Sequence, residues 1–245
     1  MAKNDPLAGE DLVDSLLRMW RTSANDSEAM PSEPRLAELT GASRNSVREA
    51  LIRLEERGYV YRSQGARTSI NLRLDDIGSR VDQQRDHSTA IAAAGYVPAV
   101  EVIDVEFFSV GADDARFDDL PDGTAVVRTR KVWSADTVPY VMAEDLIPVR
   151  GQPTEMPRIE ASDPVFDLAE QLNGVKAAWE TVWFASTLLS RSESEALRVD
   201  RPCAGLELVY RGVGPMDDVA YWSREVQITA PGRLRNALVR RVSHT

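Results

Sequence analysis

One stretch decides the fold of the first part of the chain: residues 43–58, which read SRNSVREALIRLEERG. Val47, Leu51 and Leu54 recur at a helical spacing and form one apolar stripe. The stretch opens on a serine, a preferred N-cap, and closes on a glycine, a residue that commonly follows the end of a helix. It therefore predicts a helix over residues 44–57.

The predicted helix has a polar N-terminal tip, because Arg44, Asn45 and Arg48 fall outside the apolar stripe. A shorter helix is predicted just before it, over residues 32–40, with Gly41 ending it. Two short helices joined by a glycine turn are typical of a helix-turn-helix, whose second helix places its first residues in the major groove. Arginine can bond guanine bidentately, and asparagine can do the same to adenine.

The flanking segments complete a winged form of this motif. Residues 10–22 predict an amphipathic helix, and residues 59–62 and 67–71 predict two strands around a glycine turn. Residues 31–73 carry eight arginines and five glutamates, a local charge of +3, in a chain whose net charge is −10. This basic island favours local contact with DNA phosphates. Solvated arginines and surface ion pairs are the alternative explanation.

Residues 30–70 resemble the GntR family of bacterial transcription regulators. The resemblance is carried by Met30-Pro31-Ser32-Glu33, Leu36-Ala37-Glu38-Leu39, residues 41–51, Leu54-Glu55 and Gly58-Tyr59-Val60. It implies DNA contacts by the tip of the second helix and by the wing. Two customary contacts are displaced by one residue, because Pro34 precedes Arg35 and the wing reads Gly65-Ala66-Arg67. The predicted DNA contacts are Ser32, Arg35, Ser43, Arg44, Asn45, Ser46, Arg48, Arg62, Gly65 and Arg67.

Beyond residue 84 the chain resembles itself at an offset of 81 residues. Residues 107–109 align with residues 188–190, and Val138-Pro139-Tyr140 aligns with Val219-Ala220-Tyr221. Each unit reads as strand, short helix, proline turn, strand, tight turn, strand, and an amphipathic helix over residues 163–173 lies between the units. Two such units predict one antiparallel sheet with helices on one face and a ligand cleft between halves. Duplication that serves packing alone is compatible with the same pattern.

Residues 86–228 resemble the UTRA effector domain of the HutC-type branch of the GntR family. The resemblance is carried by residues 95–98, residues 120–124, Val127-Arg128 and the hairpin over residues 133–148. It implies a fold similar to that of chorismate lyase, a homodimer, and sensing of a small, often anionic metabolite such as a phosphosugar or a carboxylate. The expected fold class is α+β. The expected parts are a winged helix-turn-helix (1–73), a linker (74–84) and an effector domain (85–245).

The predicted effector contacts are His87, Ser88, Thr89, Arg128, Arg130 and Glu144. The two arginines are two residues apart, so they share one face of a strand and suit bidentate binding of phosphate or carboxylate. Residues 87–89 open a predicted helix and could donate to an anion. In related sensors this loop and the arginine strand both line the pocket. Glu144 could accept from ligand hydroxyls or pair with an arginine, and a plain cross-strand ion pair is the alternative for Arg128.

Other classes of protein are disfavoured by composition. The chain has one cysteine, Cys203, and two histidines, so neither a disulfide nor a zinc cluster is expected, and no cofactor or catalytic residue is predicted. No apolar run reaches membrane-spanning length, and the N-terminus lacks a signal-peptide core, so a cytoplasmic protein is expected. The function predicted is that of a transcription regulator that binds double-stranded operator DNA. The resemblance implies a repressor, because repression is the commoner mode in the family. A lyase-like enzyme and a protein-binding adaptor are the alternatives.

Overall fold

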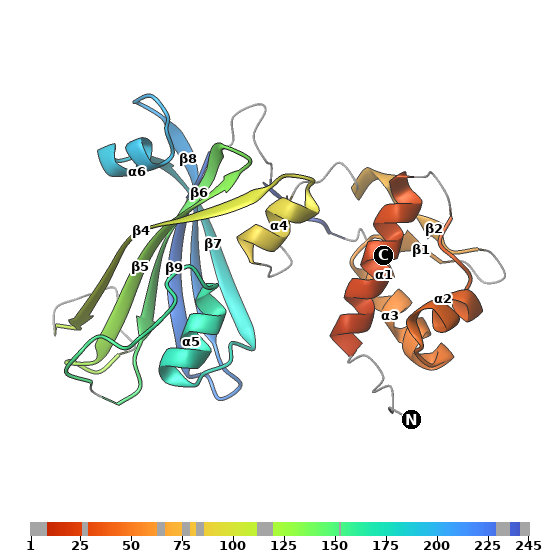
Figure 1. Cartoon of the computed structure of the whole chain (residues 1–245), viewed down its shortest axis with the longest axis horizontal. Helices are drawn as coiled ribbons and strands as arrows, with labels where there is room; N and C mark the ends of the chain where they lie inside the picture. Colours follow the sequence, from red (N-terminus) through yellow and green to blue (C-terminus); the bar gives the residue numbers. More distant parts are fainter. Residues whose placement is uncertain are drawn as a thin grey trace, which may run out of the picture. The chain divides into compact units, whose positions relative to one another are not determined.

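The computed structural model describes residues 9–25, 29–62, 67–74, 79–81, 86–111, 120–151, 153–228 and 236–240. The chain divides into two compact units, Met1–Gln84 with Asn236–Thr245, and Arg85–Arg235 (Figure 1). No helix within the described ranges is long and apolar enough to cross a membrane.

The first unit is the predicted winged helix-turn-helix. Its elements are α1(Gly9–Asn25), α2(Glu33–Thr40), α3(Arg44–Glu56), β1(Val60–Tyr61) and β2(Ser69–Ile70), followed by the short 3-10 helix η1(Leu72–Leu74). Strands β1 and β2 pair antiparallel as the wing. Residues 63–66, which include the predicted contact Gly65, lie outside the described residues.

Caps and a small core hold the three helices of this unit together. Gly41 ends α2 in the left-handed conformation at φ 69°, and the Ser43 hydroxyl caps α3 by accepting from the Ser46 amide at 3.1 Å. The apolar stripes of α1, α2 and α3 meet in one core, in which Trp20 donates its indole N–H to the Tyr59 carbonyl at 2.7 Å. The stripe read from the sequence is therefore the packing surface of the recognition helix.

The end of the chain belongs to the first unit, although the sequence assigned residues up to 245 to the second domain. Strand β10(Asn236–Ala237) pairs in parallel with β3(Ser79–Arg80), and Val239 packs against the core of the three helices. Two residues of pairing and one apolar contact leave no periodic signal in the sequence, so this return could not be predicted.

The second unit is built on one six-stranded antiparallel sheet. Its strands are β4(Pro98–Ser109), β5(Ala125–Ala135), β6(Val138–Pro148), β7(Trp179–Leu188), β8(Ala204–Val213) and β9(Val219–Gln227). The spatial order is β4-β5-β6-β9-β8-β7, so each sequence repeat supplies a three-stranded half, and the halves join where β6 pairs with β9. This confirms the α+β class with a C-terminal antiparallel sheet.

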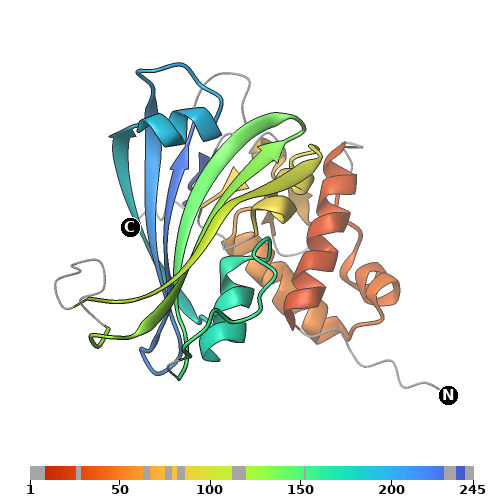
Figure 2. The ribbon, with the colours of Figure 1, turned by 60° about the vertical axis from the view of Figure 1, so that its left-hand side comes forward.

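Three helices cover the sheet: α4(His87–Ala93), α5(Val165–Asn173) and α6(Arg191–Ala196). The face that packs against α4 and α5 carries Val127, Ala143 and Tyr221, and we call it the inner face (Figure 2). The opposite, outer face carries Met142 and Val226, which pack against residues at the end of α6. Helices therefore lie on both faces, whereas the sequence analysis expected them on one face.

The core position of the recognition helix gives a stability prediction. Leu54 of α3 is fully buried, whereas Ile52 of the same helix is 42% exposed. We expect Leu54→Ala to lower the free energy of unfolding by about 2–5 kcal/mol, because it removes buried methyl groups and leaves a cavity. Ile52→Ala, the matched control, should change it by less than about 0.5 kcal/mol. Urea unfolding followed by helical circular dichroism measures both, and equal effects would contradict the packing described.

Candidate functional site

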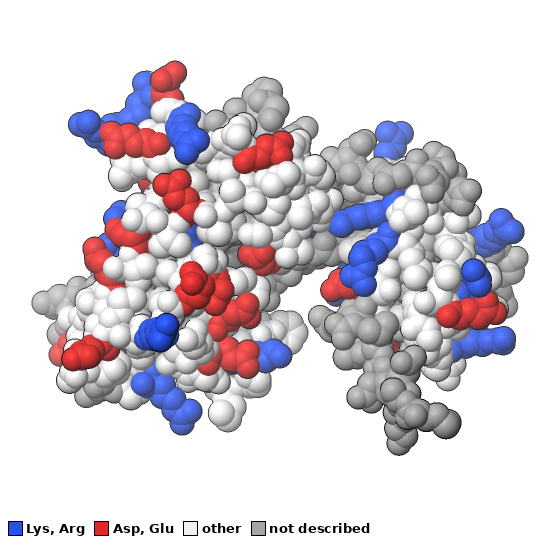
Figure 3. Space-filling model, in the orientation of Figure 1, with Lys and Arg blue, Asp and Glu red and all other residues white. Residues whose placement is uncertain are grey.

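The N-terminal tip of α3 is a solvent-facing polar surface. Arg44, Asn45 and Arg48 are all exposed, and the Ser43 and Ser46 hydroxyls lie 2.9 Å apart beside them at the capped helix start. Arginine side chains are prominent on this unit in the space-filling view (Figure 3). The tip thus presents guanidinium and amide groups of the kind that bond base edges.

A carboxylate missed by the sequence analysis organises this surface. Glu33, the first residue of α2, accepts from Arg48 Nη2 at 3.3 Å and from Arg62 Nη2 at 2.6 Å. It therefore ties the recognition helix to the beginning of the wing. Glu33 belongs to the Ser-Glu pair of the family resemblance, but nothing in its spacing identifies the two arginines as its partners.

The remaining predicted DNA contacts lie around this centre. Arg35 is exposed and forms an ion pair with Glu38 on its own helix at 3.0 Å. Ser32 is an exposed N-cap whose side chain makes no capping bond, and Arg67 is exposed at the start of the second wing segment. These three residues remain predicted DNA contacts that the structure leaves accessible.

The predicted effector contacts are divided between the two faces of the sheet. Arg130 is paired in register with Glu144, and Glu144 with Arg224, so these side chains share the outer face. The next register row is Lys131, Ala143 and Glu225, which lies on the inner face, and His87 contacts Glu225 there. The expectation that one pocket is lined by both the α4 loop and the arginines of β5 is therefore wrong.

On the outer face, acidic residues of β4 hold the arginine pair. Arg128 lies 2.6 Å from Glu106, and Arg130 forms a two-bonded ion pair with Asp104. The hydrogen bond from Arg130 lowers the pKa of Asp104 below its ordinary value. The cross-strand ion pair considered for Arg128 is what the structure has. Arg130 and Glu144 also border an outer-face pocket, together with Ser190, Ser192, Glu193 and Arg224.

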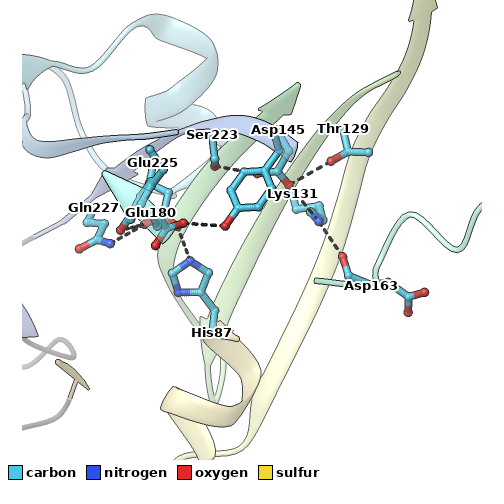
Figure 4. Close-up of polar contacts among 11 residues, drawn as sticks. His87, Thr129, Lys131, Asp145, Asp163, Glu180, Ser223, Glu225 and Gln227 are labelled. Carbon is cyan, nitrogen blue, oxygen red and sulfur yellow. Dashed lines mark hydrogen bonds and ion pairs between the residues drawn. The ribbon is translucent and has the colours of Figure 1, made fainter. Parts of the chain in front are cut away.

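On the inner face, His87 anchors the first turn of α4 to the sheet. Its Nε2 lies 2.6 Å from a carboxylate oxygen of Glu225, whose other oxygen accepts from Tyr210 and Gln227 (Figure 4). Burial disfavours the charged imidazole, but the charge and hydrogen bond of Glu225, together with the charges of Asp86 and Asp145, outweigh burial and raise the pKa of His87 above 6.5. His87 is thus the cationic partner of a half-buried ion pair.

The N-terminus of α4 is occupied by its own carboxylate. Asp86 is the N-cap and accepts from the Thr89 amide at 2.9 Å, while Ser88 is half-buried and Thr89 exposed. A carboxylate at this position already satisfies the helix end and repels a second negative charge. The expected role of residues 87–89 as anion donors therefore loses its electrostatic basis.

A second ion pair lies deeper on the inner face. Lys131 Nζ is 3.0 Å from Asp145 Oδ2, and the two side chains are 0% and 2% exposed. Asp145 also accepts from Thr129 and from Ser223, while Lys131 donates to the Asp163 carbonyl. Both members of this pair thus make further hydrogen bonds within the domain, and the Lys131 ammonium also lies 5.3 Å from the centroid of the Trp133 ring, as a buried charge requires.

An isolated carboxyl group completes the polar set. Glu180 of β7 accepts from the Tyr221 hydroxyl at 2.7 Å, and burial raises the pKa of its carboxyl group. Burial and the nearby Glu225 raise the pKa of the Tyr210 phenol as well, so it remains a hydrogen-bond donor. Within the described part of the chain, no group of three or more His, Cys, Asp and Glu is arranged to hold a metal ion.

Comparison with known families identifies both units. Residues 11–70 match the family described as "Bacterial regulatory proteins, gntR family", and residues 93–225, more than half of the chain, match the "UTRA domain" family. The chain therefore belongs to the GntR-family transcription regulators that carry a UTRA domain. It is a DNA-binding regulator whose activity responds to a bound effector.

Solved structures share the whole architecture. PhnF from Mycobacterium smegmatis is 17% identical with a TM-score of 0.58, and the match covers 95% of this chain and all of that one. The possible transcriptional regulator YydK from Bacillus subtilis subsp. subtilis str. 168 is 11% identical with a TM-score of 0.66, covering 96% and 99%. At these identities the likeness concerns the fold. No match was found among curated proteins.

A close approach on the inner face gives a second prediction. A Cβ atom at Gly212 would lie 2.6 Å from the Tyr221 ring, whereas a Cβ at Gly111 would meet nothing within 4 Å. We expect Gly212→Ala to displace the ring from Glu180 and to destabilise the domain by about 1–3 kcal/mol. Gly111→Ala is the matched control and should be close to neutral. Thermal unfolding of both variants decides, and a neutral Gly212→Ala would contradict this packing.

The buried ion pair gives a third prediction. We expect Lys131→Met to destabilise the effector domain by about 3–5 kcal/mol, because it leaves Asp145 charged and unpaired. The double variant Lys131→Met/Asp145→Asn should cost clearly less than the sum of the single changes, since no lone charge remains. Denaturant unfolding of the three variants forms the cycle. Additive costs would show that the two side chains do not interact.

Proposed function

We propose that this chain is a cytoplasmic, homodimeric repressor of the HutC-type branch. It binds a near-palindromic operator through the α3 tips of two copies and releases the operator when a small metabolite occupies the inner face of the effector domain. It acts by binding and not by catalysis. The observation that carries the proposal is the exposed Arg44, Asn45 and Arg48 tip on a capped helix whose other side is buried.

The DNA contacts proposed are those of the sequence analysis, with Glu33 added as a positioning residue. Glu33 limits the positions of Arg48 and Arg62, so less conformational freedom is lost when these arginines meet DNA. Arg44 and Asn45 then supply base contacts, and the serine hydroxyls at the helix start supply phosphate contacts.

The proposed dimer is supported by the outermost strand of the sheet. Strand β7 has a sheet neighbour on one side only, β8, and it exposes Trp183 by 52%, Phe184 by 53% and Leu188 by 72%. Phe184 and Leu188 point to the inner face and Trp183 to the outer face, so this edge strand exposes apolar side chains on both of its sides, which is typical of an interaction surface. A second copy is the partner we propose, because a twofold dimer matches two operator half-sites.

The proposed functional division follows the domain limits of the sequence analysis, except that residues 236–245 belong with the first unit. We propose that the first unit reads DNA, that the segment around β3 acts as the linker, and that the second unit binds the effector. Effector binding and operator binding then oppose each other through linkage, since a ligand that favours one arrangement of the two heads disfavours the other.

The chemistry of the effector is the finer part of the proposal. The sequence analysis expects an anionic metabolite, and this stays a prediction. The two arginines on which that expectation rests, Arg128 and Arg130, lie on the outer face and are paired with Glu106 and Asp104. The inner face has polar groups beneath α4, of which His87 is 19% and Glu225 9% exposed, and we propose that the effector binds there.

The DNA-binding part is tested by a matched pair of arginine variants. Arg44 lies at the tip of α3, and Arg53 is an exposed arginine about 13 Å further along the same helix. We expect Arg44→Ala to weaken binding to DNA from upstream of the gene by about 1–3 kcal/mol, measured by gel shift. Arg53→Ala removes the same charge and should have a smaller effect. Equal losses would show that only charge is read, and absence of any shift by the unmodified chain would refute the proposal.

A further inference from the structure

We propose that the ligand of the inner face carries a protonated nitrogen, which takes the place of the His87 imidazole on Glu225, between Trp133 and Tyr140. The inference rests on the proposed function only in placing the effector on this face. We call the position of the His87 imidazole beside Glu225 the seat. His87 occupies the seat in this structure, and the ligand competes with His87 for it.

The seat of His87 has the composition of an organic-cation site. The imidazole lies 2.6 Å from the Glu225 carboxylate, with its centroid 4.7 Å from the Trp133 ring and 6.4 Å from the Tyr140 ring. A carboxylate attracts a cation directly, and aromatic rings attract one through their electron-rich faces. A ligand that carries a protonated nitrogen can make both contacts in the place of His87.

The charges of this face disfavour an anion. The described carboxylates that act on His87 or lie beside it are Asp86, Asp145, Glu180 and Glu225, and the described cations are Lys131 and His87. Lys131 is held by Asp145, so displacement of His87 leaves two carboxylates facing the seat. An anion placed there would be repelled, whereas a cation restores the partner that the buried Glu225 carboxylate needs.

The two ion pairs of the inner face differ in accessibility. Lys131 and Asp145 are 0% and 2% exposed, and both are bonded to further groups of the domain. The side chain of His87 is 19% exposed and that of Glu225 9%, and His87 is the first residue of the short helix α4. The deeper pair is therefore a permanent support, and the His87 pair is the one that a ligand from solvent can exchange.

Exchange at this seat also gives a route to regulation. His87 is the first residue of α4, and α4 is the first helix of the effector unit along the chain. A ligand that displaces the imidazole frees the start of α4 from the sheet. The segment before α4 leads to the DNA-binding unit, so the occupant of Glu225 biases the chain that connects the two functions.

The test uses imidazole hydrochloride as the probe and the full chain as the protein, at pH 6, where imidazole is protonated. His87→Ala empties the seat, so imidazolium should raise the thermal midpoint of this variant and bind it at least about tenfold tighter than the unmodified chain. Binding is measured by ligand-observed NMR. His87→Ser, which retains a good helix-start residue, is the second variant should the alanine variant unfold.

Two controls make the result specific. His87→Ala/Glu225→Gln should lose the imidazolium response, and sodium phosphate at the same ionic strength should stabilise none of the variants. Equal imidazolium binding by the unmodified chain, His87→Ala and the double variant would overturn the inference. So would stabilisation of His87→Ala by phosphate with no response to imidazolium.

The inference and the proposed function fail separately. If the unmodified chain shifts operator DNA and an anionic metabolite releases it equally well in Glu225→Gln, the proposed function stands and the cation seat is refuted. If no operator is bound while imidazolium fills the emptied seat through Glu225, the seat stands and the regulator role is refuted.

Discussion

The antiparallel pairing of β6 with β9 is the constraint on which the effector domain depends. It joins the two repeat halves and fixes which side chains stand together: Ala143 opposite Glu225, and Glu144 opposite Arg224. Because neighbouring residues of a strand point to opposite faces, this register places the acid that His87 contacts on one face and the arginine–acid ladder on the other. A slip of one residue would exchange the two sets.

The two faces therefore have different chemistry. The outer face carries arginines and acids that pair across strands: Arg128 and Arg130 of β5 pair with Glu106 and Asp104 of β4, and Arg224 of β9 pairs with Glu207 of β8 and Glu193 of α6. The inner face encloses charges among apolar and aromatic side chains, where each charge must be matched. The ion pair of Lys131 with Asp145 is fully buried, and the ion pair of His87 with Glu225 is partly exposed. We infer that function depends more on this difference in solvent exposure between the two ion pairs than on the identity of any single residue.

Much of the fold could be predicted from the sequence because its signals are local. The caps at Ser43 and Gly41 and the stripe from Val47 to Leu54 determine the helix-turn-helix within a few residues of themselves. The repeat at a constant offset correctly predicts two three-stranded halves. The repeat does not predict the two-residue pairing of β10 with β3, which joins segments more than 150 residues apart in the sequence.

The effector site was less predictable for a physical reason. Strand parity correctly placed Arg128 and Arg130 on one face, but the face that α4 covers depends on a tertiary contact that no spacing encodes. Lys131, Asp145 and Glu225 each follow a charged residue, Arg130, Glu144 or Arg224, that points to the outer face, so nothing in the sequence marked the three inner residues as a group. The winged helix, in contrast, could be assigned down to its exposed tip, whereas the partner of Arg48 and Arg62 and the return of β10 to this unit were missed.

The central claim is that Glu225 holds His87 as a cation on the inner face. The chain contains two histidines, His87 and His244, so its imidazole NMR signals are few, and a His244→Asn variant assigns them. The account predicts that the pKa of His87 lies above 6.5 in the unmodified chain, and that Glu225→Gln lowers it, because burial is then opposed by the charges of Asp86 and Asp145 alone. A His87 pKa at or below its ordinary value in the unmodified chain, unchanged by Glu225→Gln, would contradict it.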